Sequence, residues 1–238
     1  MAGHSKWSNI KHRKGRQDAK KGKVFTRISK EIFSAVREGG EDPKTNARLK
    51  AALIKAKEAN MPSENVDRTI KKATGNLEGV TYETVTYEGY GPHGTAVFIE
   101  ALTDNRNRTA AEIRLAFNKN GGNLGENGCV AYMFKRMGIL VFEDVNEQAE
   151  ELTFAAIEAG AEDVHETEAS VEVFTSPGEF ENVRQFLADQ GFKTDDAEVG
   201  MVPDIKTDLT EDQSEEVLEL IDVLEENEDI QSVYHNLS

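Results

Sequence analysis

Apolar side chains recur at helical spacing over the first part of the chain and at alternate positions in much of the remainder. The first run predicts a helix over residues 19–36, which Gly39 and Gly40 end because glycine readily adopts the left-handed conformation after a helix. Similar patterns predict a second helix from Asp42-Pro43 to about Asn60 and a third from Pro62-Ser63 to Gly75. The inward positions are expected to be Val24, Phe25, Ile28, Ile32, Phe33 and Val36 in the first helix and Leu49, Leu53, Ile54 and Ala56 in the second. Three short amphipathic helices predict a small helical bundle.

From Tyr82 onward the period of the pattern changes from that of a helix to that of a strand. Strands are expected over 82–88 and 95–102, joined by the glycine-rich segment 89–94. A helix over 110–120 follows, and Thr109 with Glu112 has the spacing of a capping box. It ends at Gly121-Gly122, and the next strand is expected over 129–134.

Residues 138–199 predict a self-contained set of elements in the order of a ferredoxin-like domain. The expected order is strand 138–143, helix 147–159, strands 162–166 and 170–175, helix 178–189 and strand 192–199. A further helix over about 212–226 and a strand over 230–236 lack a sheet of their own, so we expect them to return to the sheet begun at Tyr82. The predicted fold class is α+β, with a basic arm and three-helix bundle (1–77), a split α/β domain (78–136 with 205–238) and an inserted, acidic ferredoxin-like domain (137–204).

Charge divides the chain sharply, although its formal net charge is −16. Residues 1–77 hold 19 Lys and Arg against 8 Asp and Glu, whereas residues 137–204 hold 2 against 18 and residues 205–238 hold 1 against 11. Such a division suits an oriented binder whose basic end contacts a polyanion and whose acidic end is repelled by it.

The first thirty residues are the most basic stretch, with ten Lys and Arg against one acid, Asp18. Planar side chains among these cations suit phosphate neutralisation combined with base stacking. The candidate nucleic-acid contacts in this arm are His4, Lys6, Trp7, Lys11, His12, Arg13, Lys14, Arg16, Lys20, Lys21 and Lys23. A solvated, frayed terminus is the alternative interpretation, and Trp7 is as well suited to pack on the bundle.

A second candidate nucleic-acid site is the segment Asn105, Arg106, Asn107 and Arg108. It stands directly before a predicted helix, whose free N–H groups and dipole favour an anion, and arginine forks match phosphate oxygens. The alternative is a turn with arginines that face solvent. The glycine-rich segments 89–94 and 121–128 permit close approach of a ligand, but loop geometry alone also explains them.

Several functional classes find no support in the residues. The single Cys129 excludes an internal disulfide and a cysteine-based zinc site, and we expect it to be a small buried residue on a strand. No metal-ligand spacing, nucleophile motif or cofactor motif is present, so no catalytic residue, metal, cofactor or small-molecule substrate is expected. No apolar run reaches the ~20 residues of a membrane span, and no signal peptide is evident, so the cytoplasm is the expected compartment.

Taken together, six segments resemble the YebC family, which is also the family of the mitochondrial translational activator of cytochrome oxidase. They are Met1–Trp7, Asn9–Lys14, Tyr87–Pro92, Thr103–Thr109, Gly121–Gly125 and Val233–Asn236, in order along essentially the whole chain. The resemblance implies three domains, the last inserted in the second, and a cytoplasmic, non-enzymatic regulator of gene expression. It implies either DNA binding, from the family label of probable transcriptional regulator, or a ribosome-associated translation factor that helps proline-rich stretches through.

The expected function is therefore a nucleic-acid-binding regulator, with ribosomal RNA or transfer RNA on the ribosome as the favoured target. Sequence-specific DNA binding is the alternative, although no helix-turn-helix is evident and the acidic segments would repel a neighbouring duplex. An enzyme on a ferredoxin-like scaffold is the alternative from a different class.

Overall fold

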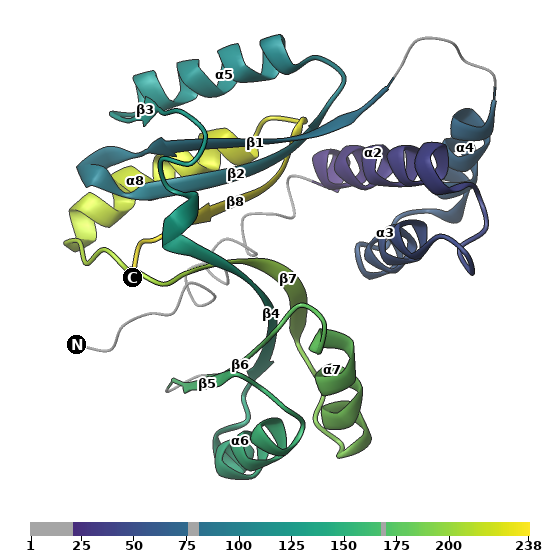
Figure 1. Cartoon of the computed structure of the whole chain (residues 1–238), viewed down its shortest axis with the longest axis vertical. Helices are drawn as coiled ribbons and strands as arrows, with labels where there is room; N and C mark the ends of the chain where they lie inside the picture. Colours follow the sequence, from purple (N-terminus) through teal and green to yellow (C-terminus); the bar gives the residue numbers. More distant parts are fainter. Residues whose placement is uncertain (1–20, 76–80, 168–169) are drawn as a thin grey trace. The chain divides into compact units, whose positions relative to one another are not determined.

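The computed structural model describes residues 21–75, 81–167 and 170–238. They form an α+β fold of helices and two four-stranded sheets, as predicted (Figure 1). The described contacts divide into two compact units, one comprising residues 21–131 and 208–237 and the other residues 132–207 with Ser238. The helices 21–75 and the first sheet thus share a unit, and the further separation of 1–77 as a domain stays a prediction.

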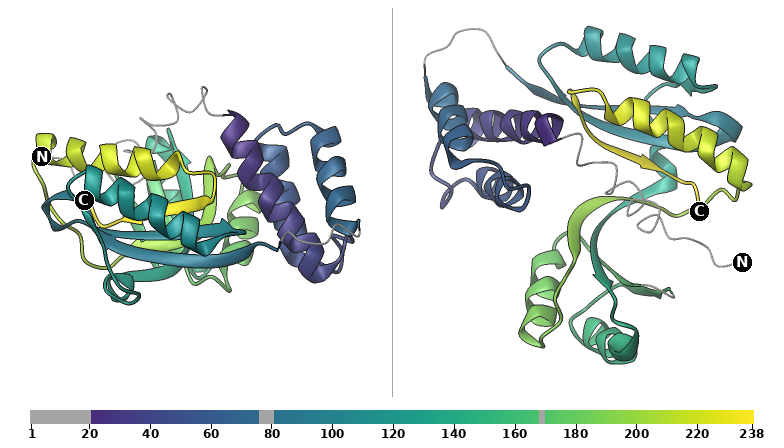
Figure 2. Two further views of the ribbon diagram at one scale, coloured as in Figure 1. Left: turned by 90° about the horizontal axis from the view of Figure 1, so that it is seen from above. Right: turned by 180° about the vertical axis from the view of Figure 1, so that it is seen from behind.

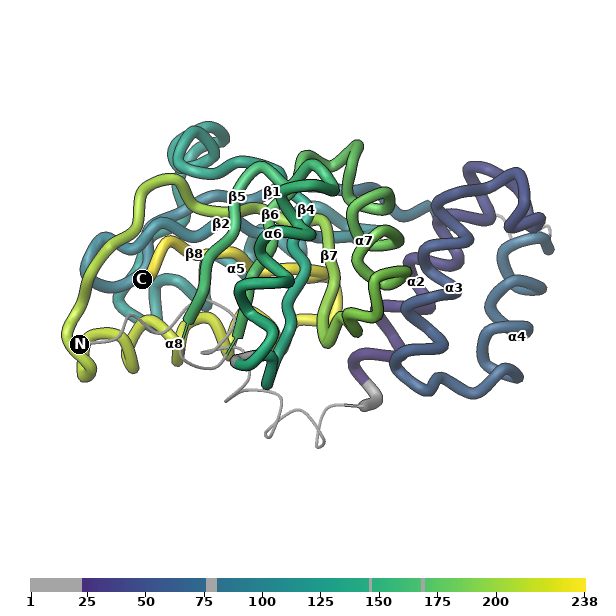
Figure 3. The backbone as a smooth tube through the Cα atoms, turned by 90° about the horizontal axis from the view of Figure 1, so that it is seen from below, coloured from purple at the N-terminus to yellow at the C-terminus, as the bar shows by residue number. Residues whose placement is uncertain are grey.

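Three helices form the N-terminal bundle: α2 (Lys21–Gly39), α3 (Ala47–Glu58) and α4 (Ser63–Thr74), traced in Figure 3. Ile28, Ile32 and Phe33 of the predicted stripe are buried in its core with Leu49 and Ala56. Gly40 follows α2 with φ +82°, which confirms the predicted left-handed stop.

Two predictions about α3 were wrong. Asp42-Pro43 lies in a turn, and the helix begins later, at Ala47, because the side chain of Asn46 accepts the hydrogen bond of Leu49 N at its N-terminus. The Nδ2 group of Asn46 also donates to Ala35 O at 2.7 Å and Gly40 O at 2.8 Å, so one buried side chain joins two helices. Ile54 is 43% exposed and faces solvent, because only one side of this short helix touches α2.

The first sheet has the strand order β3-β1-β2-β8. Its strands are β1 (Glu83–Tyr90), β2 (Ala96–Thr103), β3 (Asn123–Leu124) and β8 (Ile230–His235), and its helices are α5 (Arg106–Lys119) and α8 (Glu211–Glu225). β8 pairs antiparallel with β2, with Val97 opposite His235, so the C-terminal strand returns to the first sheet as predicted. Both helices cover one face, where Val85, Ile99, Phe117 and Leu220 share a core (Figure 2).

The second sheet has the order β5-β6-β4-β7, all pairs antiparallel, which is the ferredoxin-like arrangement. Its elements are β4 (Phe134–Glu143), α6 (Ala149–Glu158), β5 (Asp163–Glu166), β6 (Ser170–Thr175), α7 (Phe180–Asp189) and β7 (Asp196–Pro203). The two helices bury Leu152, Val183 and Leu187 against one face. The last strand lies later than the predicted 192–199, because Phe192 packs into this core first.

Residues 129–134 are not a strand throughout, which corrects a further prediction. Short 3-10 turns precede β2 (η2, Pro92–Gly94), β4 (η3, Ala131–Met133) and α6 (η4, Asn146–Gln148), and β4 begins only at Phe134. Cys129 therefore lies in a loop and is half-buried, not enclosed on a strand.

Candidate nucleic-acid interface

The N-terminus of α5 carries the four candidate residues 105–108. Asn105 is its N-cap, and its side-chain oxygen accepts from Arg108 N at 3.1 Å, while Asn105 N donates to the hydroxyl of Thr103 at 2.9 Å. The predicted capping box of Thr109 and Glu112 is wrong, since the helix begins three residues before Thr109. Thr109 is buried within the helix, and its hydroxyl donates a hydrogen bond to the carboxylate of Asp229.

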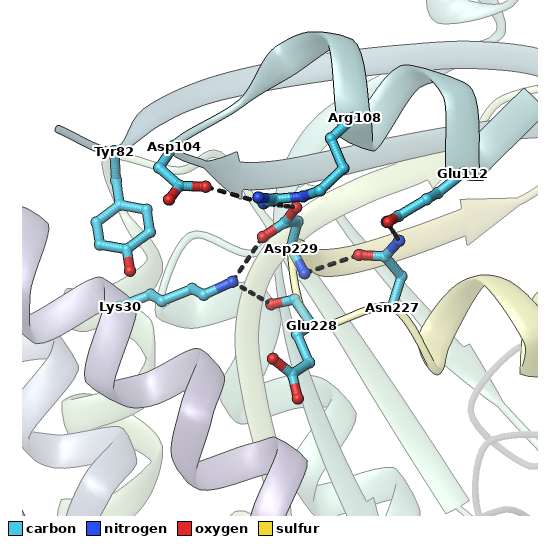
Figure 4. Close-up of a pocket in the computed structure, with 8 residues that line it drawn as sticks. All are labelled: Lys30, Tyr82, Asp104, Arg108, Glu112, Asn227, Glu228 and Asp229. Carbon is cyan, nitrogen blue, oxygen red and sulfur yellow. Dashed lines mark hydrogen bonds and ion pairs between the residues drawn. The ribbon is translucent and has the colours of Figure 1, made fainter. Parts of the chain in front are cut away.

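The carboxylate of Asp229 lies between the first turn of α5 and the bundle (Figure 4). Oδ2 accepts from Thr109 Oγ1 at 2.7 Å and from Arg108 Nη2 at 2.7 Å, and Oδ1 accepts from Lys30 Nζ at 2.6 Å. Asp229 N donates to Asn227 Oδ1 at 2.8 Å, and Asp229 O accepts from Leu102 N at 2.7 Å. The anion next to the α5 N-terminus is thus supplied by the protein itself.

The electrostatics of this junction favour its charged form. Burial by itself raises the pKa of Asp229, but the hydrogen bonds from Arg108, Lys30 and Thr109 outweigh burial and lower it from 3.8 to about 2. The same carboxylate, together with that of Asp104, raises the pKa of Arg108 above its ordinary value. Because Asp229 is only 3% exposed, solvent screens these interactions weakly.

Lys30 and Arg27 connect the bundle to the turn between α8 and β8. Lys30 Nζ also donates to Glu228 O at 3.0 Å, and Arg27 Nη2 donates to Glu225 O. The ring of Tyr82 receives the Lys30 ammonium at 5.7 Å from its centroid and meets the edge of Phe33 at 5.6 Å. Burial, and then the charges of Asp104 and Asp229, raise the pKa of the Tyr82 phenol, so it stays a neutral partner.

An open cavity of about 370 Å³ lies over this junction, lined by carboxylates, cations and one phenol. Its residues are Lys30, Tyr82, Asp104, Arg108, Glu112, Asn227, Glu228 and Asp229. Four carboxylates against two cations make it a poor acceptor for a further anion as it stands. Among the described residues no group of three or more His, Cys, Asp and Glu side chains is placed to hold a metal ion.

The candidates of residues 105–108 differ in accessibility. Arg108 is held by two carboxylates, Asp104 at 2.8 Å and Asp229 at 2.7 Å. Arg106 is 60% exposed and its nearest carboxylate, Glu83, is 3.7 Å away, and Asn107 is also exposed. Arg106 and Asn107 are therefore the members of the segment that a phosphate reaches without displacing a buried partner.

The arm candidates lie mostly outside the described residues. His4, Lys6, Trp7, Lys11, His12, Arg13, Lys14, Arg16 and Lys20 fall in residues 1–20. Lys21 begins α2, and Lys23, two residues further on, is half-buried. Their predicted contacts with nucleic acid stay a prediction.

Exposed lysines also lie on α3 and α4. Lys50, Ile54 and Lys57 follow one another at spacings of four and three, so they share the exposed face of α3. Lys71 and Lys72 are exposed near the end of α4. None of these four ammonium groups pairs with a carboxylate of the described residues, whereas Lys55 pairs with Glu31 at 2.8 Å. They are available to an external anion without the loss of an internal ion pair.

The glycine-rich segment 121–128 leads into a loop whose backbone N–H groups bind the carboxylate of Glu88. Glu88 is 4% exposed on β1, and it accepts from Gly128 N at 2.6 Å, Val130 N at 2.8 Å and Ala131 N at 2.7 Å. A Cβ on Gly122 would lie 2.7 Å from Tyr90 O, and one on Gly125 would lie 2.6 Å from Cys129 Sγ. Close packing against the end of β1 and against the Cys129 loop therefore accounts for Gly122 and Gly125.

The sequence reasoning missed Lys30, Asp229 and Glu88. Each is a charged residue that no local motif singles out, and its partner lies far away in the chain: Lys30 and Asp229 are 199 positions apart. The only local signal was the strand that begins at Ile230, which places Asp229 at a strand entrance without indicating its partners.

Comparisons with known proteins cover nearly the whole chain. The family model described as "TACO1/YebC protein N-terminal domain" matches residues 5–76, and "TACO1/YebC second and third domain" matches residues 82–237. A protein from Anoxybacillus flavithermus named "Probable transcriptional regulatory protein" is 54% identical over 239 residues, covering 100% of this chain and 98% of the relative. One of the same name from Syntrophotalea carbinolica is 53% identical over 236 residues, covering 99% and 95%.

A solved structure is similar as well. The crystal structure of a conserved hypothetical protein from Aquifex aeolicus superposes with a TM-score of 0.81 at 43% sequence identity, covering 93% of this chain and 91% of that one. Within the described residues, no helix combines the length and hydrophobicity needed to cross a membrane.

Proposed function

Because the chain belongs to the TACO1/YebC family, whose members compared above are named probable transcriptional regulatory proteins, we propose that it is a non-enzymatic, nucleic-acid-binding regulator of gene expression in the cytoplasm. Its finer role, in this proposal, is that of a ribosome-associated translation factor that contacts RNA and eases the synthesis of proline-rich stretches. No small-molecule substrate or cofactor takes part.

The observation that carries the proposal is the division of charge. Residues 1–77 combine 19 Lys and Arg with 8 acids, and the exposed Lys50, Lys57, Lys71 and Lys72 of this segment pair with no carboxylate of the part of the chain that the structure describes. Residues 137–204 combine 2 Lys and Arg with 18 acids. A phosphate backbone attracts the first segment and repels the second, so the protein binds a polyanion through one end only.

RNA on the ribosome suits this division better than an extended duplex does. A ribosome offers phosphates for the basic end and cationic proteins for the acidic end. DNA-binding transcriptional regulation is the second candidate, favoured by the names of the relatives.

The proposed contacts are the arm residues together with Asn105, Arg106, Asn107 and Arg108. Arg106 is expected to contribute more than Arg108, because the guanidinium of Arg108 has to exchange a carboxylate for a phosphate oxygen. The exposed bundle lysines Lys50 and Lys57 are further proposed contacts.

Binding of ribosomes and RNA tests the proposal directly. Deletion of residues 2–23 should abolish cosedimentation with ribosomes and weaken binding to RNA and DNA alike. Arg106→Ala and the pair Lys50→Ala with Lys57→Ala should each lower the log–log slope of affinity against salt by about 0.7–0.9 per lost phosphate contact. Lys193→Ala, which removes an exposed cation from the acidic segment, is the matched control and should leave the slope unchanged. Normal ribosome binding by the truncated protein would refute the proposal.

Two further assays distinguish a translation factor from a DNA-binding transcriptional regulator. A translation extract programmed with a reporter that contains a run of prolines should lose full-length product without the protein and regain it on addition, whereas a reporter without prolines should not respond. If the protein instead protects one sequence on random DNA duplexes and leaves the proline reporter unaffected, the second candidate is correct.

A further inference from the structure

The helices α5 and α8 lie together on the first sheet (Figure 2). The residues between them line an apolar groove that opens to solvent. Its volume is about 460 Å³. Its floor includes Ile113, Leu224 and Ile230, which are at most 1% exposed, whereas Leu115 and Val223 on its walls are 53% and 42% exposed. Two large apolar side chains on facing helices thus leave part of their surface in water above a hydrophobic floor.

The two helices that form the groove are acidic in sum, although α8 and α5 differ in sign. α8 carries seven Asp and Glu residues and no Lys or Arg in its fifteen positions, whereas α5 carries four Lys and Arg residues against one Glu. Glu112 and Glu226 line the groove itself, and Lys119 is the single cation among its lining residues. The α8 side of the groove therefore attracts a cationic partner.

We propose that this groove is the docking surface for a cationic, amphipathic helix of a partner protein. Apolar side chains at i, i+3 and i+4 of such a helix cover Leu115 and Val223, while its Lys and Arg residues face Glu112, Glu226 and the acidic surface of α8. Neutralising this surface favours fast, oriented association, and burying the two exposed side chains supplies affinity.

A second copy of the chain fits the groove poorly. A two-fold contact through it would place the seven carboxylates of one α8 near those of the other, and like charges at an interface are strongly unfavourable. The groove and the basic bundle surface carry opposite charge, so they bind different partners, and this proposal stands or falls separately from the proposed function.

The test uses the full chain and a fluorescein-labelled helical peptide of about 14 residues built from Leu and Lys at amphipathic spacing. Leu115→Glu and Val223→Glu should each weaken binding at least about tenfold, and Leu115→Ala, which adds no charge, should weaken it about threefold or more. Ile157→Glu is the matched control, because Ile157 is 59% exposed on the acid-rich helix α6, and it should alter affinity less than about twofold. The circular dichroism spectra of all four variants should match that of the unmodified protein, because the replaced side chains are 42–59% exposed and the fold does not depend on them.

The outcomes that overturn the proposal are distinct. Equal binding of the peptide to Leu115→Glu, Val223→Glu and the unmodified protein would place the contact elsewhere, and equal binding of a Leu/Glu peptide would remove the role of charge. If deletion of residues 1–20 raises the affinity for the peptide, and the same deletion has no effect in the Val223→Glu variant, then the basic arm of the same chain occupies the groove. A concentration-dependent dimer that Val223→Glu abolishes in sedimentation would make a second copy the occupant.

Discussion

Replacement of Asp229 by asparagine should loosen the contact between the bundle and the first sheet. The variant keeps the size of the side chain but removes the charge that Lys30 and Arg108 share, and it turns an amide N–H₂ group toward hydrogen-bond donors. Since the carboxylate is 3% exposed and its partners lie at 2.6–2.7 Å, we expect a loss of about 3 kcal/mol, typical of a buried ion pair with one partner removed.

The pH dependence supplies an independent estimate. The pKa of Asp229 is about 2 in the folded protein against an ordinary value of 3.8, which corresponds to roughly 2–3 kcal/mol at about 1.4 kcal/mol per pKa unit. Because the folded pKa is the lower one, this stabilisation is present above about pH 4 and is lost as the pH falls from about 4 to about 2. Asp229→Asn should lack this part of the acid sensitivity.

Hydrogen exchange followed by mass spectrometry measures the effect locally, through the opening free energy of the α5 and β8 peptides at pH 7. Urea unfolding between pH 2 and 5 then tests the acid sensitivity. Asp104→Asn is the control: it removes the other, exposed partner of Arg108 and should cost at most about 1 kcal/mol. If Asp229→Asn protects these peptides as well as the unmodified protein does, or loses stability in acid just as steeply, the reasoning about the buried junction is wrong.

Three further predictions concern other parts of the molecule. Glu88→Gln should cost about 1–3 kcal/mol and speed hydrogen exchange in residues 125–131, because one amide oxygen replaces two carboxylate oxygens that accept three N–H bonds; unchanged exchange there would contradict it. Asn46→Ala should lower the free energy of unfolding of the bundle by about 2 kcal/mol in urea titrations, through the lost cap of α3 and the lost hydrogen bonds to Ala35 O and Gly40 O, whereas Lys44→Ala in the preceding turn should have little effect. Burial, and then the charge of Glu88, raise the pKa of the Cys129 thiol above that of an exposed cysteine, so the pH midpoint of its alkylation by iodoacetamide should lie above that of a cysteine in a short peptide and should fall in Glu88→Gln.

Much of the fold was predictable because its elements follow local patterns. The stripe of α2, the left-handed Gly40 and the six elements of the second sheet need only neighbouring residues to be recognised. Even the return of β8 to the first sheet followed from a C-terminal strand pattern that lacked a sheet of its own. The errors arose where a tertiary contact overrides a local signal, as with Asn46, which displaces the start of α3 from Asp42-Pro43.

The candidate site was less predictable, because charge composition does not reveal which charges are already paired. Arg106 and Arg108 look equivalent in the sequence, yet Arg108 holds Asp229 while Arg106 is largely exposed. Lys30 counts toward the basic arm in a composition but is committed to the same carboxylate. Only the three-dimensional structure separates cations that support the protein from those free to meet a ligand.

The place of β8 in the first sheet also determines the order in which the chain assembles during synthesis. The inserted sheet has all its strands within residues 134–203, whereas β2 gains its outer neighbour only when residues 230–235 have emerged. The later-encoded sheet is therefore completed before the earlier one, opposite to the usual N-terminal-first order of folding. A chain that ends before α8 would contain the complete second sheet and an incomplete first sheet. Val97 and Ile99 of the first sheet would then lack their contacts with α8, so quality-control proteases would readily degrade such a fragment.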